Sequence, residues 1–414
     1  MKKKAISLLI VSCCLLLTGC FDKTEVEEKA YVIALGLDKA EDKNKMKVSF
    51  QIANPEVGSL QGGAGSNEPP HEVVTVTVND FISARNTLNA LVSKEVTYDL
   101  LKVIVISEEF AKEKDFIRYI YETAKDREIR RDVFLAVSKE DASKYLEKND
   151  PKQETRPHKY FQFMINRGIQ AGLIPESDLH RFFRITEHDA DLFIAMYTTT
   201  ESSDNDKKHN EDEFLAGQIN IEGDINRTQF MGSAVFKEGK MIGKMNGQET
   251  RIAILLDETS EMNDVLTTYQ DPINEDYRLA TRIIKERPID YKINLNSSPA
   301  TVNIHVSLIV EVLSDPAMTN YARDREKQEK LRDHIEKTIA YNIEKFITKS
   351  QEEFGGSPFS LSLHARKHFL TIPEFNQFDW MKSYPDMEVD VEVSIEYGEF
   401  GKQAKVPYLE ELRD

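Results

Sequence analysis

Hydrophobic and polar positions in the first half of the chain predict strands that alternate with helices. The expected strands are short apolar or alternating runs at 31–37, 46–53, 73–78, 100–106 and 133–137. The expected helices are at 81–92, 109–124, 141–148 and, in pieces broken by glycine and proline, 157–187. Asp80 and Ser107 stand where N-cap residues are expected for the first two helices. This alternation predicts a sheet with helices packed on it.

The second half of the chain is dominated by strand patterns. Strands are expected at 214–221, 229–236, 241–245, 277–286, 289–295, 301–313 and 387–397, with a short helix at 248–256. A tight turn is expected at Glu238-Gly239-Lys240. In the closing strand 387–397, apolar residues alternate with residues that are mostly acidic. Its pattern predicts an antiparallel type of strand with one buried and one solvated face.

A long helix is predicted at 320–354, near the C-terminus. Its first part, 321–330, is almost wholly charged or polar, so we expect it to project or to lie on the surface. The second part repeats apolar residues every three or four positions and carries Asn342 on the same face, which is expected to pack on a sheet. Gly355-Gly356 is expected to end the helix. The predicted fold class is α+β and multidomain, with mixed β-sheets flanked by helices and this long helix near the C-terminus.

Composition divides the chain into five expected parts. They are a signal peptide at 1–19, an N-terminal α/β-type domain at 20–198, a flexible linker at 199–213, a middle hairpin-containing subdomain at 214–262 and a C-terminal α+β domain at 263–414. The linker contains the polar run 202–213, which has no apolar side chain to bury. The stretch 55–70 is rich in glycine, but no Gly-Lys-Ser/Thr closes it, so a flexible loop is favoured over a phosphate-binding loop.

The first twenty residues have the order of a lipoprotein signal. Lys2-Lys3-Lys4 is followed by an apolar run from Ala5 to Leu17 and then by Leu17-Thr18-Gly19-Cys20, which is a lipobox. The apolar run is shorter than the roughly 20 residues that a permanent membrane-spanning helix needs, and it fits the apolar region of a secretory signal. We expect cleavage before Cys20 and a diacylglyceryl group on its sulfur. The alternative is an ordinary signal peptide with a chance cysteine.

Cysteine usage and charge narrow the class of protein further. The three cysteines are Cys13, Cys14 and Cys20, so the chain beyond Cys20 has no thiol for a disulfide, a catalytic nucleophile or a zinc site. The net charge of −17 is repelled by nucleic acid and by anionic headgroups. We therefore expect no nucleic-acid partner and a body that stands off the bilayer on its lipid tether. No later apolar run is long enough to cross a membrane, so the expected anchor is lipid only.

The residue patterns of common enzymes and metal sites are missing. His364 and His368 are four apart on an expected helix, but the sequence between them lacks the glutamate of H-E-x-x-H and contains Arg366 and Lys367, which oppose a divalent cation. His209 lies in the polar linker, where a single histidine is expected to be solvated. No serine stands in G-x-S-x-G. We therefore assign no catalytic, cofactor-binding or metal-binding residue and expect no enzyme.

Several segments together resemble the Ger(x)C family of spore germination lipoproteins. The segments are Cys20 to Glu27, Ile33 to Asp38, the hairpin Gly232 to Lys237 with Lys240 to Gly243, Phe354-Gly355, Trp380, and the closing strand through Gly398. The N-terminus and the hairpin are the more specific parts. Two departures are Phe21, where the family usually has tryptophan, and the loose fit of residues 356–379.

The resemblance implies the C subunit of a nutrient germinant receptor. Such a subunit is expected on the outer face of the spore inner membrane, or of the cell membrane, held there by acylated Cys20 beside membrane-embedded receptor subunits. The family implies a multidomain α+β body and no catalytic residues to carry over. Small nutrients are expected to be sensed by the membrane subunits, so the resemblance assigns no ligand pocket to this chain.

Two other classes of protein remain open from the sequence. One is a solute-binding lipoprotein of a transporter, which usually has two similar α/β lobes and is disfavoured by the β-rich second half. The other is an extracytoplasmic hydrolase, which is disfavoured because no site was found. The receptor subunit is the favoured interpretation.

Overall fold

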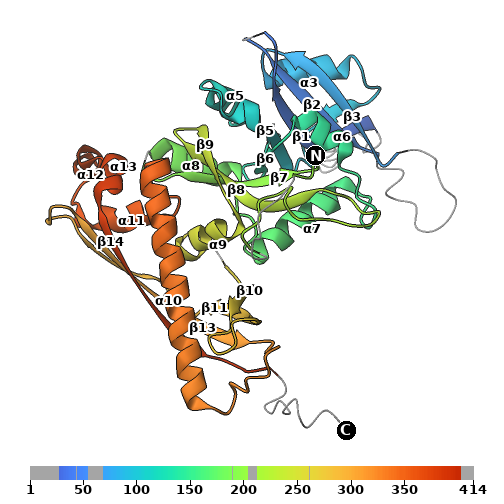
Figure 1. Cartoon of the computed structure of the whole chain (residues 1–414). Helices are drawn as coiled ribbons and strands as arrows, with labels where there is room; N and C mark the ends of the chain where they lie inside the picture. The colour runs from blue at the N-terminus through green and yellow to red at the C-terminus, as the bar shows by residue number, and fades with distance from the viewer. Residues whose placement is uncertain are drawn as a thin grey trace, which may run out of the picture.

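The computed structural model describes residues 28–42, 44–54, 69–188, 190–203, 212–260 and 262–401. In this part of the chain the strands form two sheets, and helices pack against both (Figure 1). The mixed α+β class and the long helix near the C-terminus are therefore confirmed. None of the helices in the described ranges is long and apolar enough to cross a bilayer.

The first sheet is mixed. Its strands are β1 (Lys29–Lys39), β2 (Met46–Ala53), β3 (His71–Val78), β4 (Glu95–Thr97), β5 (Val103–Ser107), β6 (Phe134–Ser138), β7 (Phe193–Thr199), β8 (Gln229–Lys237) and β9 (Lys240–Met245). The order is β3-β2-β1-β5-β6-β7-β8-β9, with β4 beside β1. Strands β1, β5, β6 and β7 are parallel, and the pairs on either side of them are antiparallel.

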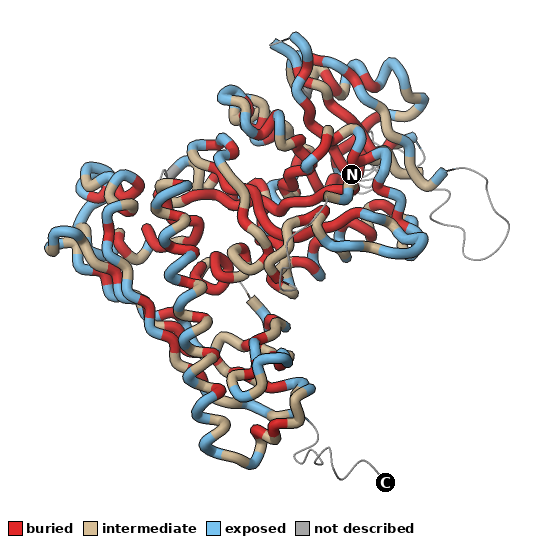
Figure 2. Tube along the Cα trace, viewed as in Figure 1, coloured by how far each residue is buried: buried red, intermediate tan, exposed pale blue. Residues whose placement is uncertain are grey.

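Helices cover both faces of the first sheet, which explains its uniformly apolar central strands. The helices are α3 (Phe81–Asn89), α4 (Glu108–Ala111), α5 (Phe116–Thr123), α6 (Ala142–Lys148), α7 (Pro157–Gln170), α8 (Leu179–His188) and α9 (Gly247–Leu256). One core contains side chains of α3, α4, α5 and α8, and another contains those of α6 and α7. Parallel strands buried on both faces read as apolar runs, and all five residues of β5 are buried (Figure 2).

The hairpin β8–β9 forms the last two strands of the first sheet. It follows residues 204–211, which lie outside the described part of the chain, yet β8 pairs directly with β7. The expected separation of an N-terminal domain from a middle subdomain at 214 therefore does not correspond to a break in the sheet. The glycine-rich residues 55–68 also lie outside the described part.

Three local predictions for this half need correction. Residues 214–221 are not a strand, because Gly217 has a φ of 95° and interrupts the extended backbone. The helix expected at 109–124 is two helices, α4 and α5. Phe110 and Phe116 pack edge to face at 5.6 Å, a contact that one straight helix would not make six residues apart. Strand β7 was not predicted.

Asp80 and Ser107 were both predicted as helix N-caps, but only Asp80 makes a capping hydrogen bond. The Asp80 carboxylate accepts a hydrogen bond from the Ser83 amide at 2.7 Å, as predicted for the start of α3. Ser107 occupies the cap position of α4, but its side chain makes no capping bond there. Its hydroxyl donates instead to the Leu37 carbonyl oxygen at 3.4 Å, so the predicted cap is wrong in its chemistry.

The second sheet has the order β10-β11-β13-β12, with β14 along the other edge of β13. Its strands are β10 (Val265–Gln270), β11 (Arg278–Lys285), β12 (Asp290–Asn294), β13 (Thr301–Val312) and β14 (Glu388–Tyr397). Strand β10 was not predicted. β14 runs parallel to β13, from the Thr301–Glu388 pair to the Val310–Tyr397 pair. The predicted antiparallel type is wrong, because the helical connection between β13 and β14 returns the chain to the same end of the sheet.

The two faces of β14 are nevertheless as predicted. Val391, Val393 and Ile395 are buried, whereas Glu388 and Glu392 are exposed. The long helix α10 (Arg325–Lys349) lies along the second sheet, and its buried residues share a core with the apolar face of β14 (Figure 1). The sequence pattern therefore identified the facing of the strand correctly but not its direction.

The long helix differs from its predicted bounds at the start. It begins at Arg325, where Asp324 caps it by accepting a hydrogen bond from the Lys327 amide at 3.2 Å. Tyr321 precedes the helix and is buried, not exposed as expected, because its hydroxyl donates to the buried carboxylate of Asp271 at 2.6 Å. After Lys349 the chain continues as a π-helical turn, Ser350–Phe354, and Gly355 with a φ of 59° ends it as predicted.

The rest of the C-terminal half is a cap of short helices. These are α11 (Leu361–Ala365), α12 (Ile372–Phe378) and α13 (Trp380–Ser383), with 3₁₀ turns at Arg366–His368 and Tyr384–Asp386. Their apolar side chains belong to the same core as α10 and the second sheet. That core also contains Leu192 and Ile194 from the region of β7, so the two sheets are joined by shared packing.

A buried set of polar contacts, here called the junction network, fastens the C-terminal half to the first sheet. Arg181 of α8 pairs with Asp257, which follows α9, and Asp257 also accepts a hydrogen bond from Ser360. The side chain of Arg181 is 10% exposed and that of Asp257 is 3% exposed, so neither charge is well hydrated. Burial lowers the pKa of Arg181 to about 10. Each charge in such a pair depends on the other for compensation.

The second branch of the junction network centres on Asp191, just before β7. Its carboxylate accepts hydrogen bonds from the hydroxyls of Ser357 and Ser362. The amide of Leu192 also donates to the Ser357 carbonyl oxygen at 2.8 Å. Burial raises the pKa of Asp191 from 3.8 to about 6, against the opposing effect of the two serine hydroxyls.

We predict that Val391→Asp destabilises the protein by several kcal/mol, because it places a charge in the core between β14 and α10. Thermal and urea unfolding of the purified chain would measure the loss. Glu392→Ala, on the exposed face of the same strand, is the control. It should change the free energy of unfolding by no more than on the order of 0.5 kcal/mol, which corresponds to about a degree or two in melting temperature. Equal melting of the two variants would contradict the facing of β14.

We predict that Asp191 makes stability fall as the pH rises from about 4 to about 6. In this window the unfolded carboxyl has released its proton while the folded one retains it, so the folded state is disfavoured progressively until Asp191 ionises. The asparagine of Asp191→Asn cannot ionise. The free energy of unfolding of this variant, relative to the wild type, should therefore rise by on the order of 1–3 kcal/mol between about pH 4 and about pH 6 and stay constant at higher pH. The exposed Asp386→Asn is the control. A difference that does not change with pH would exclude this role.

Candidate functional site

The lipidation site predicted from the sequence lies outside the described residues. Cys20 belongs to residues 1–27, and His209 of the expected linker belongs to 204–211; both ranges are outside the described part. The anchoring role of Cys20 therefore stays a prediction. The first described strand, β1, begins at Lys29, only nine residues after Cys20.

The two histidines weighed as metal ligands lie in different local structures. His364 is in α11, and its ring packs on Tyr291 with centroids 4.5 Å apart. Burial, followed by the nearby charge of Lys367, lowers the pKa of His364 and favours its neutral form. His368 lies in the following 3₁₀ turn and is exposed. In the described ranges, no group of three or more His, Cys, Asp or Glu side chains is arranged to hold a metal ion.

The hairpin and the end of the long helix, which both carry the family resemblance, meet in space. A side chain at Gly243 would have its Cβ atom 2.6 Å from the ring of Phe354, so the close approach requires glycine. Lys237 donates from Nζ to the carbonyl oxygen of Gly355 at 2.9 Å. Lys349 pairs with Glu249 of α9 at 2.8 Å, and its ammonium lies 5.5 Å from the centre of the Phe354 ring. These motifs therefore serve to dock the two halves.

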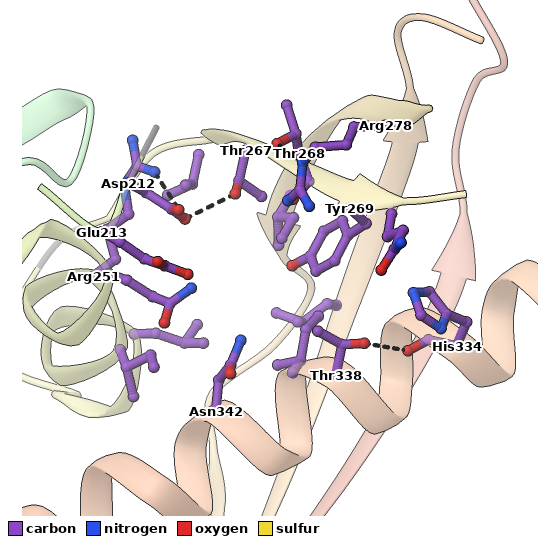
Figure 3. A pocket seen from close by; sticks show the side chains of 18 of the residues that line it. Asp212, Glu213, Arg251, Thr267, Thr268, Tyr269, Arg278, His334, Thr338 and Asn342 are labelled. Atoms are coloured by element: carbon purple, nitrogen blue, oxygen red, sulfur yellow. Dashed lines mark hydrogen bonds and ion pairs between the residues drawn. The ribbon is translucent and has the colours of Figure 1, made fainter. Parts of the chain in front are cut away.

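A cavity of about 250 Å³ lies beside this contact, between α9, the strands β10 and β11, and α10 (Figure 3). We call it the junction cavity. Its apolar wall consists of Ile252, Leu255, Val265, Ile283, Leu308 and Ile339. Its polar groups come from α9, from α10, from β10 and β11, and from the segment at Asp212 and Glu213. Cavities at the contact between two parts of a fold are common positions for binding sites.

The charged groups of the junction cavity are partly neutralised within its wall. Asp212 accepts a hydrogen bond from the Thr267 hydroxyl at 2.9 Å and lies 3.5 Å from Nη1 of Arg251. Arg251 also donates from Nη2 to the Ala171 carbonyl oxygen at 3.4 Å. Burial lowers the pKa of Arg251, and Asp212 opposes that shift. The pair is therefore a desolvated ion pair at one side of the cavity.

Neutral polar side chains project into the cavity from two other directions. Tyr269 of β10 is buried, and its hydroxyl points into the space (Figure 3). Asn342 of α10 points toward the same space from below, on the helix face that also carries Thr338 and His334. Burial raises the pKa of Tyr269 and keeps the phenol neutral. The arrangement provides hydrogen-bond donors and acceptors above an apolar wall, which suits binding.

Sequence reasoning did not identify this cavity. One signal was present, because Asn342 interrupts the otherwise apolar face predicted for the long helix. Tyr269 lies in β10, a strand that the sequence pattern did not predict. Arg251 lies on α9, which was predicted as a helix but was not assigned a part in any binding site. Residues from the segment at Asp212 and Glu213, from α9, from the second sheet and from α10 form the site only after the two halves have packed together.

Two family models match the chain over most of its length. The model described as "Spore germination protein N-terminal domain" matches residues 22–199. The model described as "Spore germination B3/ GerAC like, C-terminal" matches residues 231–401. The first match ends with β7, and the second begins inside β8, so both ranges contribute strands to the first sheet.

Individual relatives agree with these matches. The chain is 29% identical over 139 residues to spore germination protein KC of Bacillus subtilis (strain 168), an alignment that covers 33% of this chain and 34% of that protein. It is 20% identical over 401 residues to spore germination protein B3 of the same organism, covering 94% of this chain and 96% of the relative.

A solved structure shares the fold. The crystal structure of the GerBC protein matches with a TM-score of 0.52 and 15% sequence identity, covering 88% of this chain and 96% of that chain. The resemblance noted in the sequence is thus confirmed by both halves of the chain, by full-length relatives and by the fold. This chain belongs to the Ger(x)C family of spore germination proteins.

Proposed function

We propose that this chain is a lipid-anchored, non-catalytic subunit of a germinant receptor complex, needed for spores to germinate in response to small nutrients. The observation that carries the proposal is the pair of spore germination matches, which begin at residue 22, directly after Cys20, and extend to residue 401. The lipobox predicted at Cys20 precedes the first of these matches, which supports a lipid anchor at the start of a body of this family. In this proposal the folded part of the chain acts by binding partner proteins and does not catalyse a reaction.

The spacing between Cys20 and the first strand supports attachment close to a membrane. An extended chain spans at most about 3.6 Å per residue, so the nine residues from Cys20 to Lys29 reach no more than about 32 Å. A body on so short a tether stays within reach of proteins embedded in the same bilayer. We infer that its partners are membrane-embedded receptor subunits, on the outer face of the spore inner membrane or of the cell membrane.

Acyl chains supply the attachment in this proposal. Burial of lipid contributes about 0.8 kcal/mol per CH₂, and two or more chains hold stably where one is marginal. The body contributes little to membrane affinity itself, because its net charge of −17 is repelled by anionic headgroups. Lipid therefore provides the location, and protein contacts provide the specificity.

The architecture disfavours the alternative of a solute-binding lipoprotein. That class usually has two similar α/β lobes. Here the first sheet is mixed and covered on both faces by helices, whereas the second sheet has five strands and packs against one long helix. The two halves are thus unlike each other, as expected for a receptor subunit of this family.

We predict that Cys20→Ala prevents acylation and leaves the protein either unprocessed or released from the membrane fraction. Cys14→Ala is the matched control, because Cys14 lies in the segment expected to be removed. Fractionation after a high-salt wash, followed by mass spectrometry of the N-terminus, would separate these outcomes. If the Cys20→Ala protein were correctly processed and still resisted the wash, the anchor would be protein contact instead of lipid.

We predict that deletion of this chain, together with any close paralogues, abolishes germination triggered by the matching nutrient while germination by a receptor-independent stimulus continues. The chain should also co-purify with membrane-embedded subunits from detergent extracts. Complementation with the wild-type chain is the control for the deletion. Normal nutrient-triggered germination of the deletion strain would refute the receptor assignment.

A further inference from the structure

The junction cavity has a wall that favours the apolar part of a ligand. Six aliphatic side chains form this wall, each less than a tenth exposed: Ile252, Leu255, Val265, Ile283, Leu308 and Ile339. They come from α9, from three strands of the second sheet and from α10. Burial of an apolar group against such a surface is favourable in proportion to the area removed from water.

The charges around the cavity disfavour a ligand with a net charge. Four side chains with a formal charge line the cavity, the carboxylates Asp212 and Glu213 and the guanidinium groups Arg251 and Arg278, so the charges sum to zero. Asp212 pairs with Arg251, and Arg278 donates to the hydroxyl and the carbonyl oxygen of Thr268. An added anion or cation would lose hydration in this space, and a lining whose formal charges sum to zero offers it no net attraction. A ligand with no net charge avoids this cost.

Three neutral side chains that line the cavity can offer hydrogen bonds to a ligand. Tyr269, Asn342 and Gln248 line the cavity, and among the described residues their hydroxyl and carboxamide groups bond to no other protein group. Tyr269 is only 8% exposed, and its hydroxyl points into the cavity, where water or a ligand can bond to it. A phenol and two carboxamides offer both donors and acceptors to a polar head group.

We propose that the junction cavity binds a small amphiphilic molecule without net charge. Its aliphatic body lies against the apolar wall, and its neutral head, of the carboxamide or hydroxyl type, bonds to Tyr269, Asn342 and Gln248. The volume of about 250 Å³ limits the ligand to a small molecule. The proposal does not depend on the receptor assignment, because it concerns only what this chain binds.

The test compares three probes with the same carbon skeleton and different head groups. They are 3-methylbutanamide, which is neutral, 3-methylbutanoate, an anion, and 3-methylbutylamine, a cation. Binding to the purified full-length chain would be followed by ligand-observed NMR and by the shift in melting temperature. We expect saturable binding of the amide, at least about tenfold tighter than that of either charged probe. Equal or tighter binding of a charged probe, or no saturable binding of the amide, would overturn the proposal.

Two variants locate the binding in the cavity. Tyr269→Phe removes only the hydroxyl and should weaken amide binding about threefold to tenfold, without loss of thermal stability because the hydroxyl has no partner in the protein. Asn342→Leu keeps the approximate size of the side chain and should weaken it similarly. Tyr277→Phe, on an exposed tyrosine that does not line the cavity, is the matched control and should bind like the wild type. Unaltered binding in both cavity variants would overturn the assignment of the site.

Discussion

The close contact between the hairpin β8–β9 and the end of the long helix is the constraint on which the rest of this structure depends. Phe354 occupies the space that a side chain at position 243 would need, and Lys237 holds the carbonyl oxygen of Gly355. Because β8–β9 belongs to the first sheet and α10 packs on the second, this contact determines how the two halves are placed. The junction network adds a second connection, in which Arg181 and Asp257 compensate each other's burial.

The junction cavity is a consequence of this docking. Helix α9 follows directly from the hairpin, and Lys349 of α10 pairs with Glu249 of α9 at one end of the space. Beyond that end, side chains of α9, of α10 and of the second sheet leave the cavity of about 250 Å³ between them. A cavity formed in this way contains groups from both halves, so its shape depends on their relative position.

Much of the local structure could be predicted because it depends on neighbours in the sequence. The buried face of β14 follows from strict alternation, the start of α3 from the carboxylate of Asp80, and the end of the helix from Gly355. Strand β7 was missed although its first five residues form an apolar run, whereas two adjacent threonines interrupt the apolar positions of β10. The antiparallel assignment of β14 failed because a one-faced alternation does not distinguish the two directions when a helix supplies the return connection.

The sequence by itself determined the family, the α+β class, the faces of the elements and the residues that begin or end several helices, since all of these depend on short-range periodicity and side-chain chemistry. Only the tertiary structure decided which strands are neighbours, that the hairpin completes the first sheet, and that a cavity lies between α9 and α10. Its decisive contacts join residues far apart in the chain: Arg181 and Asp257 are separated by 76 positions, and Asp191 and Ser357 by 166. Local sequence patterns do not identify such pairs, because each of these residues is compatible with its own helix, strand or turn in many other folds.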